Sequence, residues 1–378
     1  MQEGCCYDDL HENSVSNGLF IIFGSGQADI IRVKLIKLAT TNSHSCNEVM
    51  ELEEYNILRA FKQEAASNPQ MRFIEKHSDY ISVELKSTCA QKSTFSMYRL
   101  FPGVIVNFHD LNITSMPAYN GEIASGLKLN FCIDGRCELN TCDGIRFFLE
   151  PDDFCICFSQ VKDVFSFPGG HYRGVEIYVH ESELINRTCS IFCEMGLDAG
   201  EICSRLCGNK SLFFHKGNGD IKRLFLAMRD PPAGHEISWL KIKLAELFIL
   251  LSTSGDLLKE EPRRFYTASQ VEMAKQVMQI VSEDLSARHS IETLAGRYDI
   301  STSSLKSYFK GVYGKSISEH LKAARMSAAA SALQGTTINI SEIASSVGYE
   351  NASKFTAAFK VYSGVTPLEY RRQTRCIL

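Results

Sequence analysis

The sequence predicts a multidomain α+β protein in which a β-rich domain precedes a helical region and a C-terminal all-α domain. Three observations predict this order. Short alternating apolar segments fill residues 76–180, helical spacing dominates residues 181–260, and one pattern occurs twice within residues 263–378. With 378 residues, the chain is long enough for two or three domains with sizeable cores.

The composition is that of a globular protein, with 44% hydrophobic and 22% charged residues. The first residues lack the basic and then apolar segments of a signal peptide, and the most apolar run, Leu244–Leu251, is too short to cross a bilayer. We therefore expect a cytoplasmic protein without a membrane partner. Its 14 cysteines are then expected to be reduced thiols.

Charge is divided unevenly along the chain. Residues 262–378 hold 15 Lys and Arg against 9 Asp and Glu, a net charge of +6, so the whole-chain net of −4 leaves −10 for residues 1–261. A basic C-terminal part on an acidic partner domain favours nucleic-acid binding, although a solvated face produces the same imbalance.

The β-rich domain is predicted from short β-branched and aromatic segments separated by turn signals such as Asp143-Gly144 and Pro168-Gly169-Gly170. Such a series favours a sandwich or barrel. The hairpin sequence of residues 134–156 resembles those of cupin-like barrels, but the stretch LNFCIDGRCE lacks the histidines of metal-dependent members. We therefore expect an effector-sensing barrel without a metal or cofactor. A pocket would be lined by residues such as Phe131, Phe147, Phe158 and Tyr178; the alternative is a solid core.

The helical region, residues 181–260, leaves two questions open. Leu240, Leu244, Leu247 and Leu251 form one stripe, which suits either a dimerisation helix or a helix that closes the barrel. Cys189/Cys193 and Cys203/Cys207 are spaced i, i+4, which suits core packing better than a zinc site. No function is predicted for residues 1–75, although residues 49–65 have helical spacing. Residues 259–270 are predicted to be a linker.

The repeated pattern is FKGVYGKSISEH, residues 309–320, and FKVYSGVTPLEY, residues 359–370. Each copy ends a predicted pair of helices joined by a tight turn, at residues 290–313 and 339–363. Ser290 and Asn339 suit the first caps, and Asp299 and Gly348 suit the left-handed turn residues. Gly314 and Gly364 suit the helix stops, and the following helices begin with Ser316/Glu319 and Thr366/Glu369 capping boxes.

With these motifs, residues 270–372 resemble the DNA-binding part of the AraC/XylS family of bacterial transcription regulators. The segment GKSISEHLKAARMSAAASAL resembles that family's long connecting helix, with Arg325 at its arginine position. The resemblance implies a sequence-specific regulator, mostly an activator that contacts RNA polymerase, with promoter DNA and an unidentified small-molecule effector as further partners. A homodimer is left open, as are the target genes and the choice between activation and repression.

The resemblance also implies which residues face DNA. Recognition helices are expected over residues 302–312 and 352–362, capped by Ser301 and Asn351, with Thr302 opening the first. The expected base-facing residues are Ser303, Lys306, Ser307, Ala352, Ser353, Thr356 and Ala357. The expected phosphate contacts are Lys310, Lys354, Lys360, Arg371 and Arg372. Because the second helix has almost no long donor at its base-facing positions, we expect weak direct readout there.

The sequence lacks the motifs of several other functions. A regulator of alkyl-DNA repair with a cysteine methyl acceptor needs a Pro-Cys-His-Arg motif, which is absent from the sequence. No phosphate loop, Ser-x-x-Lys pair or HExxH motif is present either, so we do not expect an enzyme. An architectural DNA binder and a non-metal cupin-type binding protein remain as alternatives.

Overall fold

The computed structural model describes residues 57–86, 91–117, 126–140, 144–159, 165–180, 195–208, 212–217, 219–253 and 262–375, all within one compact unit, Asn47–Leu378. The strands are β1 (Met71–Lys76), β2 (Tyr80–Leu85), β3 (Ser93–Phe101), β4 (Val104–Leu111), β5 (Gly126–Gly135), β6 (Cys137–Asn140), β7 (Arg146–Leu149), β8 (Asp153–Ser159), β9 (Tyr172–His180) and β10 (Leu212–Lys216). The helices of the first two regions are α2 (Ile57–Ser67), α5 (Ala199–Cys207), α6 (Gly219–Met228) and α7 (Glu236–Thr253).

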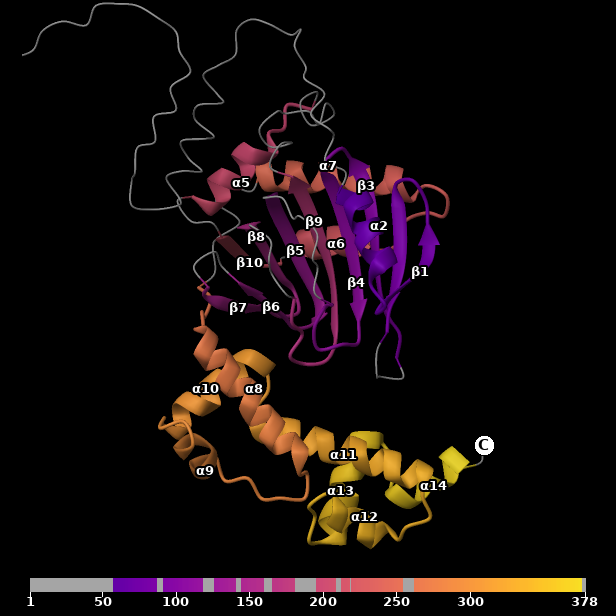
Figure 1. Cartoon of the computed structure of the whole chain (residues 1–378), viewed down its shortest axis with the longest axis vertical. Coiled ribbons are helices and arrows are strands. Elements are labelled where there is room, and N and C mark those ends of the chain that lie inside the picture. Colours follow the sequence, from indigo (N-terminus) through magenta and orange to yellow (C-terminus); the bar gives the residue numbers. More distant parts are fainter. Residues whose placement is uncertain are drawn as a thin grey trace, which may run out of the picture. The chain divides into compact units, whose positions relative to one another are not determined.

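The β-rich domain is built on one eight-stranded antiparallel sheet with the strand order β1-β2-β3-β4-β9-β5-β8-β10 (Figure 1). Strands β6 and β7 form a separate hairpin. The predicted β-rich domain is therefore confirmed as an antiparallel sheet. Pairing among the described strands leaves β1 and β10 at the two ends, so it does not show a closed barrel.

Each face of the sheet is covered by a different core. One face, with residues such as Leu129 and Ile177, packs against α5, α6 and α7. The opposite face packs against α2 and the β6–β7 hairpin. Phe131 belongs to the first core, where it stacks on Phe225 of α6 at 4.9 Å, and Phe147 belongs to the second. The suggestion that Phe131 and Phe147 line one pocket was therefore wrong, because they lie on opposite faces; the side chain of Phe158 is outside the described residues.

One expectation for residues 181–260 changes, and one of its open questions is answered. Residues Leu212–Lys216 form strand β10, which pairs with β8, although helix was predicted throughout. Buried Phe213 and Phe214 point to opposite faces of the sheet, which two adjacent aromatic residues do in a strand but not in a helix. The leucine stripe of α7 is fully buried against the sheet, so it covers the β-rich domain and is not exposed for dimerisation.

The cysteine pair Cys203/Cys207 lies on one face of α5, within the core. Burial raises the pKa of the Cys203 thiol well above its ordinary value. Cys189 and Cys193 lie outside the described residues. In the described ranges no cluster of three or more potential metal ligands is present, and none of the helices there has the length and apolar character of a membrane span.

The C-terminal helical part comprises α8 (Ala268–Glu283), α9 (Ile291–Gly296), α10 (Thr302–Tyr313), α11 (Ile317–Gly335), α12 (Ile340–Ser346), α13 (Ala352–Ser363) and α14 (Pro367–Arg375). We call α9–α10 the first unit and α12–α13 the second unit. Each has its own core: the first is built on α8 with Leu305 and Phe309, and the second on α11 with Phe355 and Phe359. Helix α11 connects the two units (Figure 1).

The turn residues and helix stops predicted for this part are confirmed. Asp299 and Gly348 occupy the left-handed region, with φ of 52° and 78°. Gly314 and Gly364 end α10 and α13 with φ of 76° and 80°. Local chemistry thus fixes where each recognition helix begins and ends, to within one residue of the sequence prediction.

Arg325 of α11 connects both units. Its Nε donates to Leu285 O at 2.7 Å and its Nη2 donates to Ala287 O at 3.0 Å, just before the first unit. The same guanidinium lies beneath the turn of the second unit, where a Cβ on Gly348 would stand 2.7 Å from Nη2.

Gly348→Ala is expected to lower the free energy of unfolding more than Gly364→Ala. Both glycines have left-handed φ, which costs an alanine about 1–2 kcal/mol. A Cβ at Gly364 meets no atom within 4 Å, whereas one at Gly348 meets Arg325 and Leu285 O. Overpacking should add about 1–3 kcal/mol at Gly348, measurable by thermal and denaturant melts. Equal losses would show that the Arg325 side chain moves aside freely.

Arg325→Met is expected to destabilise the C-terminal helical part by about 2–3 kcal/mol, because two backbone carbonyls lose a charged donor. Lys322→Met removes a charge from the exposed side of the same helix and serves as the control. Denaturant melts measure the free energy of unfolding of both variants. Equal stability of the two would contradict the connecting role of Arg325.

Candidate nucleic-acid interface

Each unit has helix-turn-helix geometry, with the second helix entered through a capped turn. The Ser301 hydroxyl accepts a hydrogen bond from Ser304 N at 3.1 Å and caps α10. The Asn351 side-chain oxygen accepts from Ser353 N at 2.9 Å and from Lys354 N at 3.0 Å and caps α13. Ser301 and Asn351, both predicted to contact DNA, therefore use their side-chain oxygens to cap helices.

The first recognition helix, α10, presents a polar outer face. Leu305 and Phe309 are buried beneath it, while Ser303, Lys306 and Lys310 are exposed. Thr302 and Ser307 are partly buried. Lysines one turn apart on a solvent-facing helix are suited to reach base edges and phosphates.

Ser307 has a partner that the sequence reading missed. Arg264, in the segment before α8, donates from Nη1 to the Ser307 hydroxyl at 3.1 Å. The sequence predicts only a linker for the Arg263-Arg264 pair. The basic pair is visible in the sequence before the domain. No local sequence pattern indicates, however, that it contacts α10.

The second recognition helix, α13, presents small side chains together with two lysines. Ala352, Ser353, Lys354, Ala357 and Lys360 are exposed, and Thr356 is partly buried. Val361 is 80% exposed one helical turn after Ala357, and it was also missed. Its position extends the outer face of α13 with a second apolar side chain, since residues four apart share a helix face.

The two arginines of α14 differ in position. Arg371 donates from Nη2 to Ile338 O at 2.6 Å, which ties α14 to the segment before α12. Arg372 is exposed. Of these two arginines, both predicted to contact phosphates, Arg372 is therefore the more exposed.

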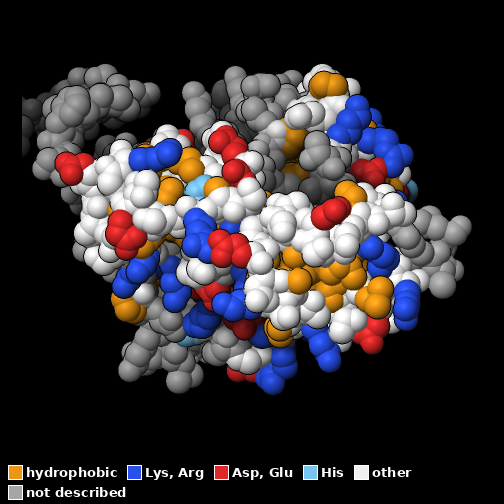
Figure 2. All heavy atoms as spheres, turned by 90° about the horizontal axis from the view of Figure 1, so that it is seen from below, with side chains coloured by type: hydrophobic (Ala, Val, Ile, Leu, Met, Phe, Trp, Pro, Cys, Tyr) orange, Lys and Arg blue, Asp and Glu red, His pale blue; other side chains and the backbone are white. Residues whose placement is uncertain are grey.

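Charge on this side of the molecule is interspersed. In the view of Figure 2, Lys and Arg side chains alternate with Asp and Glu and surround an exposed hydrophobic patch. The exposed large hydrophobic residues of the second unit and its surroundings are Ile338, Val361, Tyr362 and Leu368. Hydrogen bonds at the Thr366 backbone lower the pKa of the Glu369 carboxyl, and Lys360 and Arg372 lower it further.

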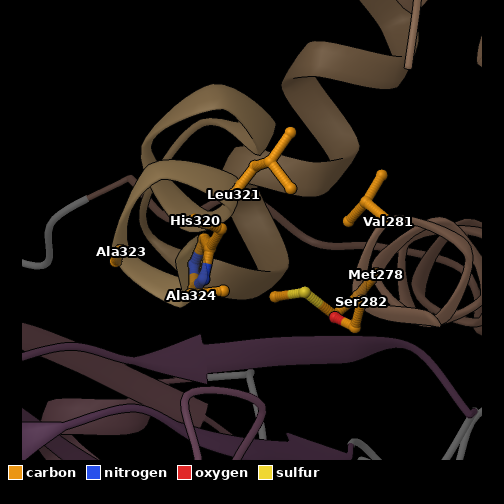
Figure 3. A pocket seen from close by; sticks show the side chains of 7 residues that line it. All are labelled: Met278, Val281, Ser282, His320, Leu321, Ala323 and Ala324. Carbon is orange, nitrogen blue, oxygen red and sulfur yellow. The ribbon is translucent and has the colours of Figure 1, made fainter. Parts of the chain in front are cut away.

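A pocket of about 260 Å³ lies between α8 and α11 (Figure 3). Its lining is mostly apolar, with Met278 and Val281 from α8 facing Leu321 from α11. His320 packs on the rings of Phe309 and Tyr313, and its burial lowers its pKa. This pocket lies on α8 and α11, the two helices that support the recognition helices.

Three cysteines of the β-rich domain lack the exposure and low pKa of a reactive thiol. Cys132, Cys137 and Cys155 are buried, and burial raises the pKa of each thiol. A methyl acceptor requires a thiolate in reach of a DNA strand. These three buried thiols are therefore not suited to act as a methyl acceptor.

Comparisons with known proteins agree with the geometry. A family model described as a helix-turn-helix domain matches residues 294–373. The transcriptional activator RhaR of Yersinia pseudotuberculosis serotype O:3 is 31% identical over 142 residues, which cover 36% of this chain and 47% of RhaR. The chain thus spans less than half the length of that relative.

Two solved structures are also similar. The C-terminal domain of AraT, a response regulator from Geobacillus stearothermophilus, is 32% identical and covers 27% of this chain and 84% of its own, with a TM-score of 0.26. ToxT from Vibrio cholerae is 15% identical and covers 71% of this chain and 98% of its own, also with a TM-score of 0.26. Residues 294–373 thus match a helix-turn-helix domain family, and this part of the chain is similar to the transcriptional activator RhaR.

Proposed function

We propose that the protein is a sequence-specific DNA-binding transcription regulator that responds to a small-molecule effector and acts mainly as an activator. The observation that carries the proposal is the attachment of two capped recognition helices to one connecting helix. The curated relative RhaR is an activator, which supports the direction of regulation.

The length of α11 suits two successive major grooves. Its 19 residues span about 28 Å at 1.5 Å per residue. One turn of B-DNA is about 34 Å, so recognition helices at either end of α11 can engage adjacent grooves on one face of the duplex. We therefore expect a binding site with two contacted segments about 10 base pairs apart.

The two units have different side chains for readout. In the first, Lys306 can donate to guanine O6 and N7, and Ser303 and Ser307 add short polar groups. In the second, Ala357 and Val361 are suited to thymine methyl groups. Lys310, Lys354, Lys360 and Arg372 would contact phosphates, whereas Arg371 would chiefly position α14.

We further propose that the β-rich domain, as a cupin-like barrel, is the effector-sensing part. One of the two covered faces of its sheet combines apolar side chains with three polar residues on adjacent strands. Asn107, Glu176 and Asn130 are opposite one another on β4, β9 and β5, and Asn107 Nδ2 donates to Glu176 Oε1 at 2.9 Å. Small-molecule sites are typically apolar with a few such polar groups. RNA polymerase and a second copy of the chain are the further proposed partners.

The direct test is selection of duplexes from a random library by the full chain, followed by sequencing. The proposal expects one enriched site with two segments about one helical turn apart. Enrichment without a consensus would indicate an architectural DNA binder instead. Reporter transcription from the selected site then separates activation from repression.

Lys306→Ala and Lys360→Ala are expected to differ in kind. Lys306 is exposed in the N-terminal half of α10, so its loss should relax preference at one or two base pairs and cost about 1–3 kcal/mol at the selected site. Lys360 follows buried Phe359 near the end of α13, so its loss should weaken all duplexes equally and reduce the salt slope by about one.

Quantitative binding of both variants to a half-site library at several salt concentrations distinguishes these effects. Lys315→Ala, an exposed lysine after the α10 stop, provides a matched change of charge. If Lys306→Ala weakened every duplex alike while Lys360→Ala altered the preferred bases, the assigned helix register would be wrong.

A further inference from the structure

The segment that leads into α8, residues 263–266, is extended. Tyr266 and Arg146 of β7 exchange backbone hydrogen bonds of 2.8 Å in both directions, as neighbouring strands do. Successive side chains of an extended segment point to opposite sides. The side chains of residues 263 and 265 are therefore expected on one side of this segment, and those of residues 264 and 266 on the other.

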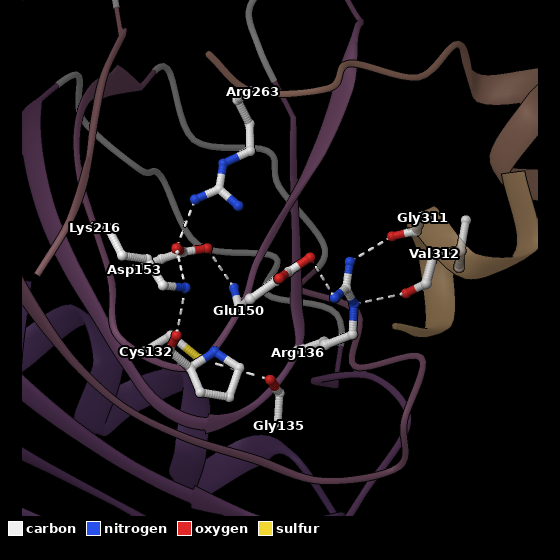
Figure 4. A network of polar contacts seen from close by, with 10 residues as sticks. Cys132, Gly135, Arg136, Glu150, Asp153, Lys216, Arg263, Gly311 and Val312 are labelled. Carbon is white, nitrogen blue, oxygen red and sulfur yellow. Dashed lines mark hydrogen bonds and ion pairs between the residues drawn. The ribbon is translucent and has the colours of Figure 1, made fainter. Parts of the chain in front are cut away.

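Residues 263 and 265 contact the β-rich domain. Arg263 pairs at 2.6 Å with Asp153, which is fully buried, and its guanidinium lies over the Phe214 ring at 4.9 Å (Figure 4). The Phe265 ring meets the Phe147 ring at 6.2 Å. A buried carboxylate needs its cation, so these contacts fix the segment on this side.

Residues 264 and 266 contact the first recognition helix, α10. Arg264 donates from Nη1 to the Ser307 hydroxyl at 3.1 Å, and a Cβ on Gly311 would collide with the Tyr266 ring and hydroxyl. Ser307 and Gly311 are one helical turn apart. Four residues of helix rise about 6 Å and two residues of extended chain span about 6.6 Å. The segment therefore runs alongside α10 in the same direction, with matched spacing.

This alignment places Arg264 at the border of the outward face of α10. Exposed Ser303, Lys306 and Lys310 define that face, and Ser307 follows Ser303 by one turn. A recognition helix inserts its N-terminal residues between the two strands that border the major groove. A side chain held beside the middle of such a helix is suited to meet the backbone of one of these strands.

The Arg264 guanidinium retains most of its hydrogen-bonding capacity. Arginine has five N–H donors in a planar fork, and the bond to Ser307 uses one of them. The side chain is exposed, and none of the described carboxylates forms an ion pair with it. The charge of the neighbouring Arg263, in contrast, is compensated by Asp153. Arg264 thus offers an uncompensated positive charge next to the recognition helix.

We propose that Arg264 is a DNA contact outside both helix-turn-helix units, which binds a phosphate on a strand that borders the groove entered by α10. This inference rests on the proposed DNA-binding function. A guanidinium fork matches two phosphate oxygens. Ser307 orients the fork before DNA binds, which reduces the side-chain freedom lost in the complex. Because Arg264 lies at the flank of α10 and not on its outward face, a phosphate suits its position better than a base edge does.

The experiment measures binding of Arg264→Gln in the full chain, at several salt concentrations, to the selected site and to a random-sequence 30-base-pair duplex. Affinity for both duplexes is expected to fall about tenfold, and the salt slope to decrease by about one. Arg223→Gln removes the same charge from an exposed ion pair on α6 and should leave affinity and salt slope unchanged. If Arg264→Gln bound as the Arg223→Gln control does, the inference would be wrong.

Arg264→Lys distinguishes a direct contact from a structural role. It keeps the charge and loses the fork, so we expect a salt slope equal to that of the wild type and an affinity about threefold lower. Weaker binding by Arg264→Gln with an unchanged salt slope would indicate that Arg264 only supports the fold of α10. A change in the bases preferred by Arg264→Gln would show base readout, and either result would refute the phosphate contact.

A double-mutant cycle tests whether Ser307 positions Arg264. Ser307→Ala should weaken binding to the random-sequence duplex in the wild-type background, and much less in the Arg264→Gln background. Equal losses in both backgrounds would refute the positioning role. If the wild type bound neither duplex, the DNA-binding function would fail and this inference with it. If the wild type bound DNA and Arg264→Gln bound equally well, the inference alone would fail.

Discussion

The guanidinium of Arg325 is the interaction on which the geometry of the two recognition helices depends. It is anchored in α11, bonds the backbone that leads into α9 and lies under the turn at Gly348. One side chain of the connecting helix therefore contacts the segment before the first unit and the turn of the second. Because Gly348 has no Cβ, the turn can approach the guanidinium closely, so the glycine is required by packing as well as by its positive φ.

The C-terminal helical part could be predicted from sequence because local chemistry determines it. Ser301, Asn351, Gly314 and Gly364 each act within four residues of their own position, and the structure places all four as predicted. Asp299 was expected to replace glycine at a left-handed turn, and its φ of 52° confirms this. Rules of this kind need no knowledge of the tertiary fold.

The features that sequence reasoning missed depend on contacts between distant segments. Strand β10 is a strand because it pairs with β8, more than fifty residues earlier. Phe131 and Phe147 were assigned to one pocket because the sequence does not show which face of the sheet each occupies. The bonds from Arg136 to Gly311 and from Arg264 to Ser307 are likewise tertiary contacts, which no local pattern encodes.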